Sequence, residues 1–357
     1  MSSRFDSASQ KSVEMRLLVL ENSVDGDGPE SLNAEPVFET TTTPEKLWKT
    51  LLILRQHLGN TDLNRFRVTL TLPSARDNQW IPLIDFWSRY FLKGLGLELA
   101  TGRLANRFQP IVSRSTVKIF GHELLVHYAD QETQFNAGDL LQHAGNEAER
   151  WAIERLCWMA CIRGLKNLPL RTLGFVNINP QLFFYGLTNW KIVEQALQES
   201  SVSKSRVVTE ILESATPYDP SLLREFVADC RRQGFSIALD DWGRQSHSLA
   251  MLDLVRPDFL KLEMETVRGC HEDHYRRTMV NGVIELCRKL KTRIILEGIE
   301  SRQDWDWAKN TGADLVQGYF LGRPATQPIE SLAIPATIVL GPHFQSRSVV
   351  ENAATTE

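Results

Sequence analysis

The stretch Phe235-Ser236-Ile237-Ala238-Leu239-Asp240-Asp241-Trp242-Gly243 runs from mostly apolar residues directly into two adjacent carboxylates. This pattern predicts a short buried strand that ends at a polar site. Because successive side chains of a strand point to opposite faces, Asp240 and Asp241 can share one site only if the backbone turns there, and Gly243 gives it that freedom. The stretch alone leaves two interpretations open: a divalent-metal site built on paired Asp residues, or a solvated turn.

Strand and helix patterns alternate on both sides of this stretch. The hydrophobic periodicity predicts strands at residues 108–112, 117–128 (with a bulge at Gly121), 173–177, 206–211, 235–239, 259–262, 293–296 and 315–316. It predicts helices at residues 146–165, 187–199, 220–233, 246–254, 274–290 and 302–311. The first two strands pair naturally as a hairpin, and the repeated β-α units that follow favour a closed parallel barrel over an open sheet. Chemistry in such barrels lies at the carboxyl ends of the strands.

Length and composition indicate a soluble globular protein. The chain has 357 residues, of which 42% are hydrophobic and 24% charged, and its net charge of −4 supplies no basic field for polymeric nucleic acid. The start lacks the apolar core of a signal peptide and no run is long enough to span a bilayer, so we expect a cytoplasmic protein. The five cysteines form no zinc pattern and are expected to be buried thiols in a reducing compartment.

The chain divides into four predicted parts. Residues 1–40 read as weakly ordered, apart from one short strand at 15–20. Residues 41–100 form a small α/β module, with a helix at 44–58, a strand at 67–72 and a helix at 80–97. It is either a sensory or dimerisation module, which we favour, or an extension packed on the main domain. The barrel domain follows at 101–332, and residues 333–357 form a tail expected to be disordered at its end.

Polar side chains recur where the predicted strands end. Such groups are costly at the inner ends of apolar strands unless they are paired or bound to a metal, and a whole succession of them argues against simple solvated ends. Oxygen ligands without His or Cys select a hard cation, Mg²⁺ or Mn²⁺. The residues at these positions are Glu123, Asn177, Glu210, Asp240, Asp241, Lys261, Glu297 and Gln317.

Residues 104–330 resemble an EAL domain, the phosphodiesterase family that hydrolyses cyclic di-GMP. Each matching piece is weak alone, but together they follow the order of the family's motifs. The pieces are Phe108-Gln109-Pro110-Ile111-Val112, Glu123-Leu124-Leu125, Val176-Asn177-Ile178-Asn179-Pro180, Glu210-Ile211-Leu212-Glu213-Ser214, Asp240-Asp241-Trp242-Gly243, Leu260-Lys261-Leu262-Glu263, Glu297-Gly298-Ile299-Glu300 and Gln317-Gly318-Tyr319-Phe320-Leu321-Gly322-Arg323-Pro324.

The resemblance implies a modified (β/α)₈ barrel of the TIM type with an antiparallel strand near its start. It also implies a site with two cations, Mg²⁺ or Mn²⁺, that activate water to give linear pGpG. One cation would be held by Glu123, Asn177, Glu210 and Asp240, and the second by Asp241, with Asp240 bridging. Glu297 and Gln317 would complete the inner shell through the metals or their waters. Lys261 would orient or help deprotonate the water, and Glu213 would hold the loop after Asp241. The residues implied to contact cyclic di-GMP are Gln109, Leu125, His127, Gln317 and Arg323.

Two departures from the family pattern keep other functions open. His127 stands where the family usually has an Arg that contacts substrate phosphate, and Arg244-Gln245-Ser246-His247 replaces the family's usual loop. Arg244 is a candidate for the lost phosphate contact. A second hypothesis is therefore a cyclic di-GMP receptor with weak or no turnover, and a third is a protein-interaction module. The resemblance further implies a homodimer, and a protein partner is conceivable through the N-terminal region.

Overall fold

The structure is a computed structural model, and everything below concerns the residues that it describes. These are residues 15–21, 36–42, 47, 50, 51, 54, 58, 65–71, 81–83, 86, 104–129, 134–142, 144, 147–184, 186–213, 220–243 and 248–332.

Eight strands close into a barrel between residues 104 and 317. In order around the barrel, β5 is followed by β13, β12, β11, β10, β9, β8 and β6, and β6 pairs back to β5. Strand β5 is antiparallel to both of its neighbours, while every other pair is parallel, so the predicted closed barrel with one antiparallel strand is confirmed. The strands are β5 (Leu104–Ser113), β6 (Ile119–Ala129), β8 (Leu173–Asn177), β9 (Val207–Leu212), β10 (Ser236–Trp242), β11 (Phe259–Leu262), β12 (Arg293–Leu296) and β13 (Leu315–Gln317).

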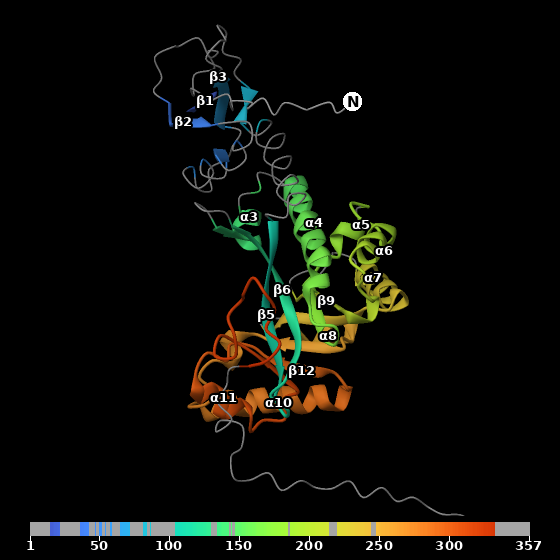
Figure 1. The fold of residues 1–357 in the computed structure, drawn as a ribbon. Coiled ribbons are helices and arrows are strands. Elements are labelled where there is room, and N and C mark those ends of the chain that lie inside the picture. The colour runs from blue at the N-terminus through green and yellow to red at the C-terminus, as the bar shows by residue number, and fades with distance from the viewer. Residues whose placement is uncertain are drawn as a thin grey trace, which may run out of the picture.

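The β5–β6 hairpin is longer than the rest of the barrel. Strand β6 pairs with β8 only from Gly121 to Glu123, whereas it pairs with β5 as far as Tyr128. The end of β6 also pairs with the short strand β7 (Gln134–Asn136). Figure 1 shows the hairpin as two long arrows that reach past the parallel strands toward α3 (Ala137–Gln142). The predicted bulge is present, because the register shifts by one residue beside Gly121.

Helices connect and cover the parallel strands. Helix α4 contacts β5, β6 and β8, and α7 contacts β10 and α8. Both ends of helix α10 are capped. The Asp273 side chain accepts backbone N–H groups of the first turn, and Lys291 ends the helix in a left-handed conformation with φ 61°. The helices are α4 (Glu147–Gly164), α5 (Gln181–Phe184), α6 (Trp190–Glu199), α7 (Pro220–Gln233), α8 (Ser248–Val255), α9 (Met264–Val267), α10 (His274–Leu290) and α11 (Arg302–Ala308).

An apolar layer fills the inside of the barrel. The rings of Phe175 and Phe259 meet edge to face with their centroids 5.2 Å apart. The guanidinium of Arg293 lies over the Phe259 ring, 4.1 Å from its centroid, and 5.0 Å from that of Phe120. The barrel interior is therefore packed rather than open, as in other barrels of this size. The buried residues of the layer are Ile111, Phe175, Val208, Ala238, Phe259, Ile295 and Leu315.

A separate four-stranded antiparallel sheet precedes the barrel. Its order is β2 (Phe38–Thr42), β1 (Met15–Glu21), β3 (Phe66–Thr71) and β4 (Ile81–Pro82). Leu47, Leu51 and Leu54 are helical and buried, in keeping with the helix predicted at 44–58. Strand β1 of this sheet lies in the segment predicted at residues 1–40. Strand β4 lies at the start of residues 80–97, where a helix was predicted. The division into 1–40, 41–100, 101–332 and 333–357 stays a prediction, and the tail lies outside the described residues.

Two further expectations concern thiols and membranes. All five cysteines are free and buried, as predicted. Burial raises the pKa of the Cys157, Cys230 and Cys287 thiols to about 12, so they stay protonated and unreactive at neutral pH. Within the part of the chain that the structure describes, no helix combines the length and the apolar character needed to cross a bilayer.

Candidate active site

The candidate site forms a polar layer directly above the apolar layer of the barrel. On six parallel strands, or one residue past the strand end in the case of Glu297, a polar residue follows two positions after an apolar residue of the interior, so both side chains point inward. On β5, which runs the other way, Gln109 precedes Ile111 by the same spacing. The polar residues are Asn177, Glu210, Asp240, Lys261, Glu297 and Gln317, and their apolar partners are Phe175, Val208, Ala238, Phe259, Ile295 and Leu315.

Lys261 lies at the centre of this layer. Its Nζ atom lies 2.9 Å from Asp240 Oδ1, 3.0 Å from Glu210 Oε1, 3.0 Å from Glu297 Oε1 and 3.4 Å from Glu123 Oε2. The Lys261 side chain is 1% exposed and that of Glu210 is 0% exposed. One ammonium group on β11 therefore links carboxylates from β6, β9, β10 and the end of β12.

Two amide side chains fix the orientation of Glu123. Asn177 Nδ2 donates to Glu123 Oε1 at 3.4 Å and to Glu210 Oε2 at 3.3 Å. Gln317 Nε2 donates to Glu123 Oε2 at 2.7 Å. The buried Gln317 Oε1 has no hydrogen-bond partner among the described residues. An oxygen in that situation is a ready acceptor or ligand, because a buried polar atom without a partner is costly.

The site holds more carboxyl groups than its single ammonium group can keep ionised. Burial raises the pKa of Glu210 well above its usual value, against the opposing effect of Lys261. Burial likewise raises the pKa of Glu297 to about 8, again against Lys261. Burial alone would lower the pKa of Lys261, but the surrounding carboxylates outweigh it and raise that pKa well above its usual value. One ammonium therefore faces several carboxylates, which is the charge balance of a site made for additional cations.

The backbone turn predicted at the paired Asp residues is present. Asp241 has φ 54° and Gly243 has φ 107°, both in the left-handed region, and the register with β11 shifts between Leu239 and Trp242. As a result Asp240, Asp241 and Glu297 bring carboxylate oxygens within 4.8 Å of one another. Asp240 is only 6% exposed, which favours the metal-site interpretation over a solvated turn.

Glu213 supports this turn from the neighbouring strand end. Its carboxylate Oε2 accepts the Gly243 backbone N–H at 3.2 Å, and its own backbone N–H donates to the Asp240 carbonyl at 3.0 Å. Glu213 thus holds the start of the segment that follows Asp241. The altered loop Arg244-Gln245-Ser246-His247 itself lies outside the described residues, so the proposed role of Arg244 stays a prediction.

The other predicted nucleotide contacts lie on the β5–β6 hairpin and in the segment that follows β13. Gln109 is paired with Glu123 across the hairpin, and Leu125 and His127 follow on the same face of β6. Arg323 lies in the segment after β13, with its guanidinium 4.4 Å from the centroid of the Tyr319 ring. Arg107 lies on the same face of β5 as Gln109. It was not singled out from the sequence, because the first barrel strand was predicted to begin at Phe108. The available signal was its spacing of two residues from Gln109.

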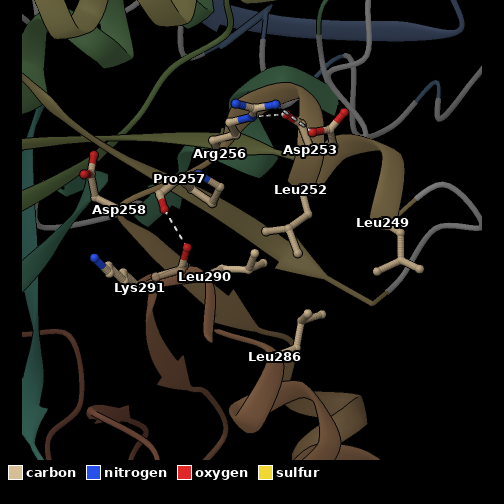
Figure 2. A pocket seen from close by; sticks show the side chains of 10 residues that line it. Leu249, Leu252, Asp253, Arg256, Pro257, Asp258, Leu286, Leu290 and Lys291 are labelled. Atoms are coloured by element: carbon tan, nitrogen blue, oxygen red, sulfur yellow. Dashed lines mark hydrogen bonds and ion pairs between the residues drawn. The ribbon is translucent and has the colours of Figure 1, made fainter. Parts of the chain in front are cut away.

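A hollow of about 600 Å³ lies away from the polar layer, where β11 and β12 begin. Figure 2 shows Leu249 and Leu252 of α8 on one side and Leu286 and Leu290 of α10 on the other. Its polar contacts are local: Arg256 pairs with Asp253 at 3.1 Å, and Thr292 donates to the Pro257 carbonyl at 2.9 Å. The hollow holds none of the residues of the polar layer, so we place the candidate chemistry at the other end of the strands.

The fold and the site together define a class of protein, an eight-stranded α/β barrel with one antiparallel strand and an acidic layer at the carboxyl ends of its strands. A family model described as the EAL domain matches residues 95–324, which is more than half of the chain. The chain belongs to the EAL domain family.

Curated relatives are distant and much longer. An uncharacterized signaling protein of Caulobacter vibrioides is 26% identical over 260 residues, covering 70% of this chain but 30% of that protein. The cyclic di-GMP phosphodiesterase NbdA of Pseudomonas aeruginosa is 23% identical over 235 residues, covering 63% of this chain and 29% of NbdA. The chain thus spans about a third of the length of these relatives.

Solved structures share the fold. The c-di-GMP-bound form of a standalone EAL protein from Vibrio cholerae O395 has a TM-score of 0.56 and 24% identity, covering 64% of this chain and 95% of that one. The MucR phosphodiesterase of Pseudomonas aeruginosa in complex with c-di-GMP has a TM-score of 0.57 and 23% identity, covering 67% and 98%. A Klebsiella pneumoniae BlrP1 complex that contains manganese and cyclic di-GMP has a TM-score of 0.55 and 21% identity, covering 62% and 56%.

Proposed function

We propose that this protein is a metal-dependent phosphodiesterase that hydrolyses cyclic di-GMP to linear pGpG. The observation that carries the proposal is the cluster of buried carboxylates around Lys261 at the carboxyl ends of the barrel strands. Family membership supports the substrate, since relatives are named as cyclic di-GMP phosphodiesterases and neighbouring structures hold this nucleotide. The retained acidic positions favour an enzyme over a binding protein.

The donor set suits two hard divalent cations, Mg²⁺ or Mn²⁺. Glu123, Asn177, Glu210 and Asp240 would hold one, and Asp240, Asp241 and Glu297 the other, with Gln317 Oε1 as a further acceptor. When bound, such cations neutralise the phosphodiester charge and lower the pKa of a nucleophilic water. Calcium and manganese in neighbouring complexes with cyclic di-GMP support the choice of a divalent ion.

Lys261 would act as a donor that orients the water. Its raised pKa keeps it as an ammonium ion at neutral pH, and an ammonium ion donates hydrogen bonds but accepts no proton. In the site without cations Lys261 can therefore orient the water, while its predicted part in deprotonating the water stays a prediction. Glu213 would act through the backbone of Gly243, by keeping Asp241 turned toward the site. Gln109, Leu125, Gln317 and Arg323 would line the nucleotide, and His127 would lie at its edge.

The decisive experiment is an assay of the purified full chain with cyclic di-GMP and either Mg²⁺ or Mn²⁺. We expect pGpG to accumulate by chromatography, and chelation by EDTA to stop it. Glu123→Ala should abolish turnover, while Glu272→Gln on the exposed surface should leave it unchanged. Binding of cyclic di-GMP without any product would contradict the enzyme proposal.

A receptor is the second candidate function. His127 favours it, because the neutral imidazole offers fewer phosphate contacts than the guanidinium usual in the family. A receptor would bind cyclic di-GMP with a measurable Kd and release no pGpG. A protein-interaction module, the third candidate, would bind no nucleotide at all. Whether the protein is an enzyme or a receptor, we propose that it is a cytoplasmic homodimer. Residues 1–100 would then pass its signal to a protein partner.

A further inference from the structure

The inner face of the β5–β6 hairpin continues outward beyond the acidic layer. Across the hairpin, Gln109 is opposite Glu123, Arg107 is opposite Leu125, and Ala105 is opposite His127. Because every second residue of a strand shares a face, Arg107 and His127 lie on the same face as Gln109 and Glu123. Each step of two residues moves about 7 Å along the strand, so Arg107 lies one such step beyond the carboxylates.

The opposite face of the hairpin is occupied by the protein itself. Asn106 Nδ2 donates to Cys161 Sγ of α4 at 3.4 Å, and His122 contacts the Ile329 carbonyl at 3.0 Å. Both residues are buried. Arg107 and His127 are only half-buried, on the face that continues from the candidate site. Arg107 and His127 therefore lie on the face along which a ligand of that site would extend.

The two side chains contact each other. Arg107 Nη2 lies 3.0 Å from His127 Nε2. Burial, and then the charge of Arg107, lowers the pKa of His127, so the imidazole is neutral and Nε2 accepts the hydrogen bond. This contact restricts the orientation of the guanidinium. His127 thus acts as a positioning residue for Arg107.

The charge at this place fits an anion. The layer below is dominated by carboxylates, which repel the phosphates of any nucleotide that approaches. Along the inner face of the described parts of β5 and β6, Arg107 is the one side chain with a permanent positive charge. A planar guanidinium binds a phosphate through two parallel hydrogen bonds, which an ammonium or a neutral imidazole cannot do.

We propose that Arg107, oriented by His127, binds a phosphate group of the cyclic dinucleotide at the rim of the barrel. The inference rests on the proposed function. The resemblance to the family places the phosphate contact at position 127 of β6, whereas this proposal places it at Arg107 of β5. The contact is to a phosphate that does not react, so it stabilises the bound substrate and the transition state equally.

The test compares variants of the full chain in two measurements. The first is the Kd for cyclic di-GMP in the presence of Ca²⁺ by calorimetry, and the second is the kinetics of pGpG formation with Mn²⁺. Arg107→Ala should raise both Kd and KM roughly tenfold and change kcat less than about threefold. Arg107→Lys should recover part of the loss, and His127→Ala should show a smaller rise in Kd than Arg107→Ala.

A double variant separates binding from a structural role. Arg107→Ala combined with His127→Arg returns a guanidinium to the same face from the other strand, and should restore most of the affinity. The exposed Arg288→Ala on α10 removes the same charge at a remote place and should leave Kd unchanged. All variants are checked for an unchanged thermal unfolding midpoint, so that loss of fold is not taken for loss of binding.

The outcomes distinguish this inference from the proposed function. If the wild type binds and hydrolyses cyclic di-GMP but folded Arg107→Ala does so with unchanged Kd and KM, the phosphate contact is wrong and the proposed function stands. A Kd raised by Arg107→Ala without rescue in the double variant would also overturn the contact. A wild type that binds nucleotide without turnover overturns the enzyme proposal alone, and the Kd comparison still applies. If the wild type binds no cyclic di-GMP, both proposals fall.

Discussion

Lys261 Nζ lies 3.0 Å from Glu210 Oε1, and neither side chain is more than 1% exposed. This pair links the stability of the barrel to the charge of the candidate cation site. The ammonium joins carboxylates from four other strands or strand ends, and the same carboxylates are the candidate cation ligands. Any change in the charge of one partner must therefore alter both the stability of the barrel and its affinity for divalent ions.

Removing the central ammonium should destabilise the metal-free protein. In Lys261→Met the chain keeps its apolar stem but leaves several buried carboxylates without a cation, and we expect a loss of about 3–5 kcal/mol in the free energy of unfolding. Denaturant titration in EDTA measures it. Lys289→Met, 70% exposed on α10, serves as the control and should change stability little. Equal effects of the two substitutions would show that the carboxylates are not held by Lys261.

The metal-free protein should lose stability as pH rises. The pKa of Glu297 in the folded state is about 8, against an ordinary value of 4.5, and that of Glu210 is also raised. Between pH 4.5 and 8 the folded state therefore binds more protons than the unfolded state. Stability then falls as pH rises through this interval. Thermal unfolding in EDTA measures this slope.

Glu297→Gln provides the variant for the pH experiment, because its amide does not titrate. The slope should become shallower in this variant and stay unchanged in Glu272→Gln, whose side chain is 82% exposed. Mn²⁺ should reduce the slope in the wild type, because cations displace the same protons. A wild type that is more stable at pH 8 than at pH 5 in EDTA would contradict the raised pKa values.

Two substitutions of Asp241 separate the effect of backbone strain from the effect of losing a metal-ligating carboxylate. At φ 54° Asn is tolerated nearly as well as Asp, whereas a β-branched residue is disfavoured. Asp241→Asn should thus unfold close to the wild type, and Asp241→Val should lose about 1–2 kcal/mol. Both should weaken Mn²⁺ binding measured by calorimetry. Wild-type Mn²⁺ affinity in Asp241→Asn would remove Asp241 from the ligand set.

Gly318 should tolerate no side chain. A Cβ atom there would lie 2.1 Å from the Ile299 carbonyl oxygen and 2.3 Å from its nitrogen, and the Ile299 N–H donates to the carbonyl of the adjacent Gln317. Gly318→Ala should therefore cost at least about 1–3 kcal/mol and displace Gln317 from Glu123, with a loss of activity. Denaturant titration and the pGpG assay measure the two effects.

Gly282 provides the matched control for Gly318. It lies inside α10, and a Cβ atom added there would meet no neighbouring atom within 4 Å, so Gly282→Ala should gain about 0.5–1 kcal/mol through helix propensity. Its turnover should equal that of the wild type. The account of Gly318 fails if Gly318→Ala is as stable and active as Gly282→Ala.

The barrel and the acidic residues were predictable because both follow from short-range pattern. The short parallel strands are mostly apolar and carry a polar residue at or near their carboxyl ends, so these ends could be found without knowing which strands are neighbours. Trp242 and the bulge beside it extend β10 past the predicted end at Leu239, yet the pair Asp240 and Asp241 was still recognised from sequence alone.

Features that depend on pairing with a neighbouring strand could not be predicted from the sequence. Strand β5 begins at Leu104 rather than at the predicted Phe108, because residues 104–107 are held by hydrogen bonding to β6 and not by their own periodicity. Arg107 was missed for this reason. Ile81 and Pro82 pair with β3 at the point where a helix was predicted, which is again a long-range effect.

The packed rings of Phe175 and Phe259, with Arg293 lying over Phe259, close one end of the barrel. The interior is packed at that end, so in the proposed enzyme the cations, the nucleotide and the product would all enter and leave at the carboxyl ends of the strands. A ligand bound at that end would therefore block the loading of cations as well as the release of product. A segment or a partner that covered the rim formed by the β5–β6 hairpin would then stop every step of the proposed reaction at once.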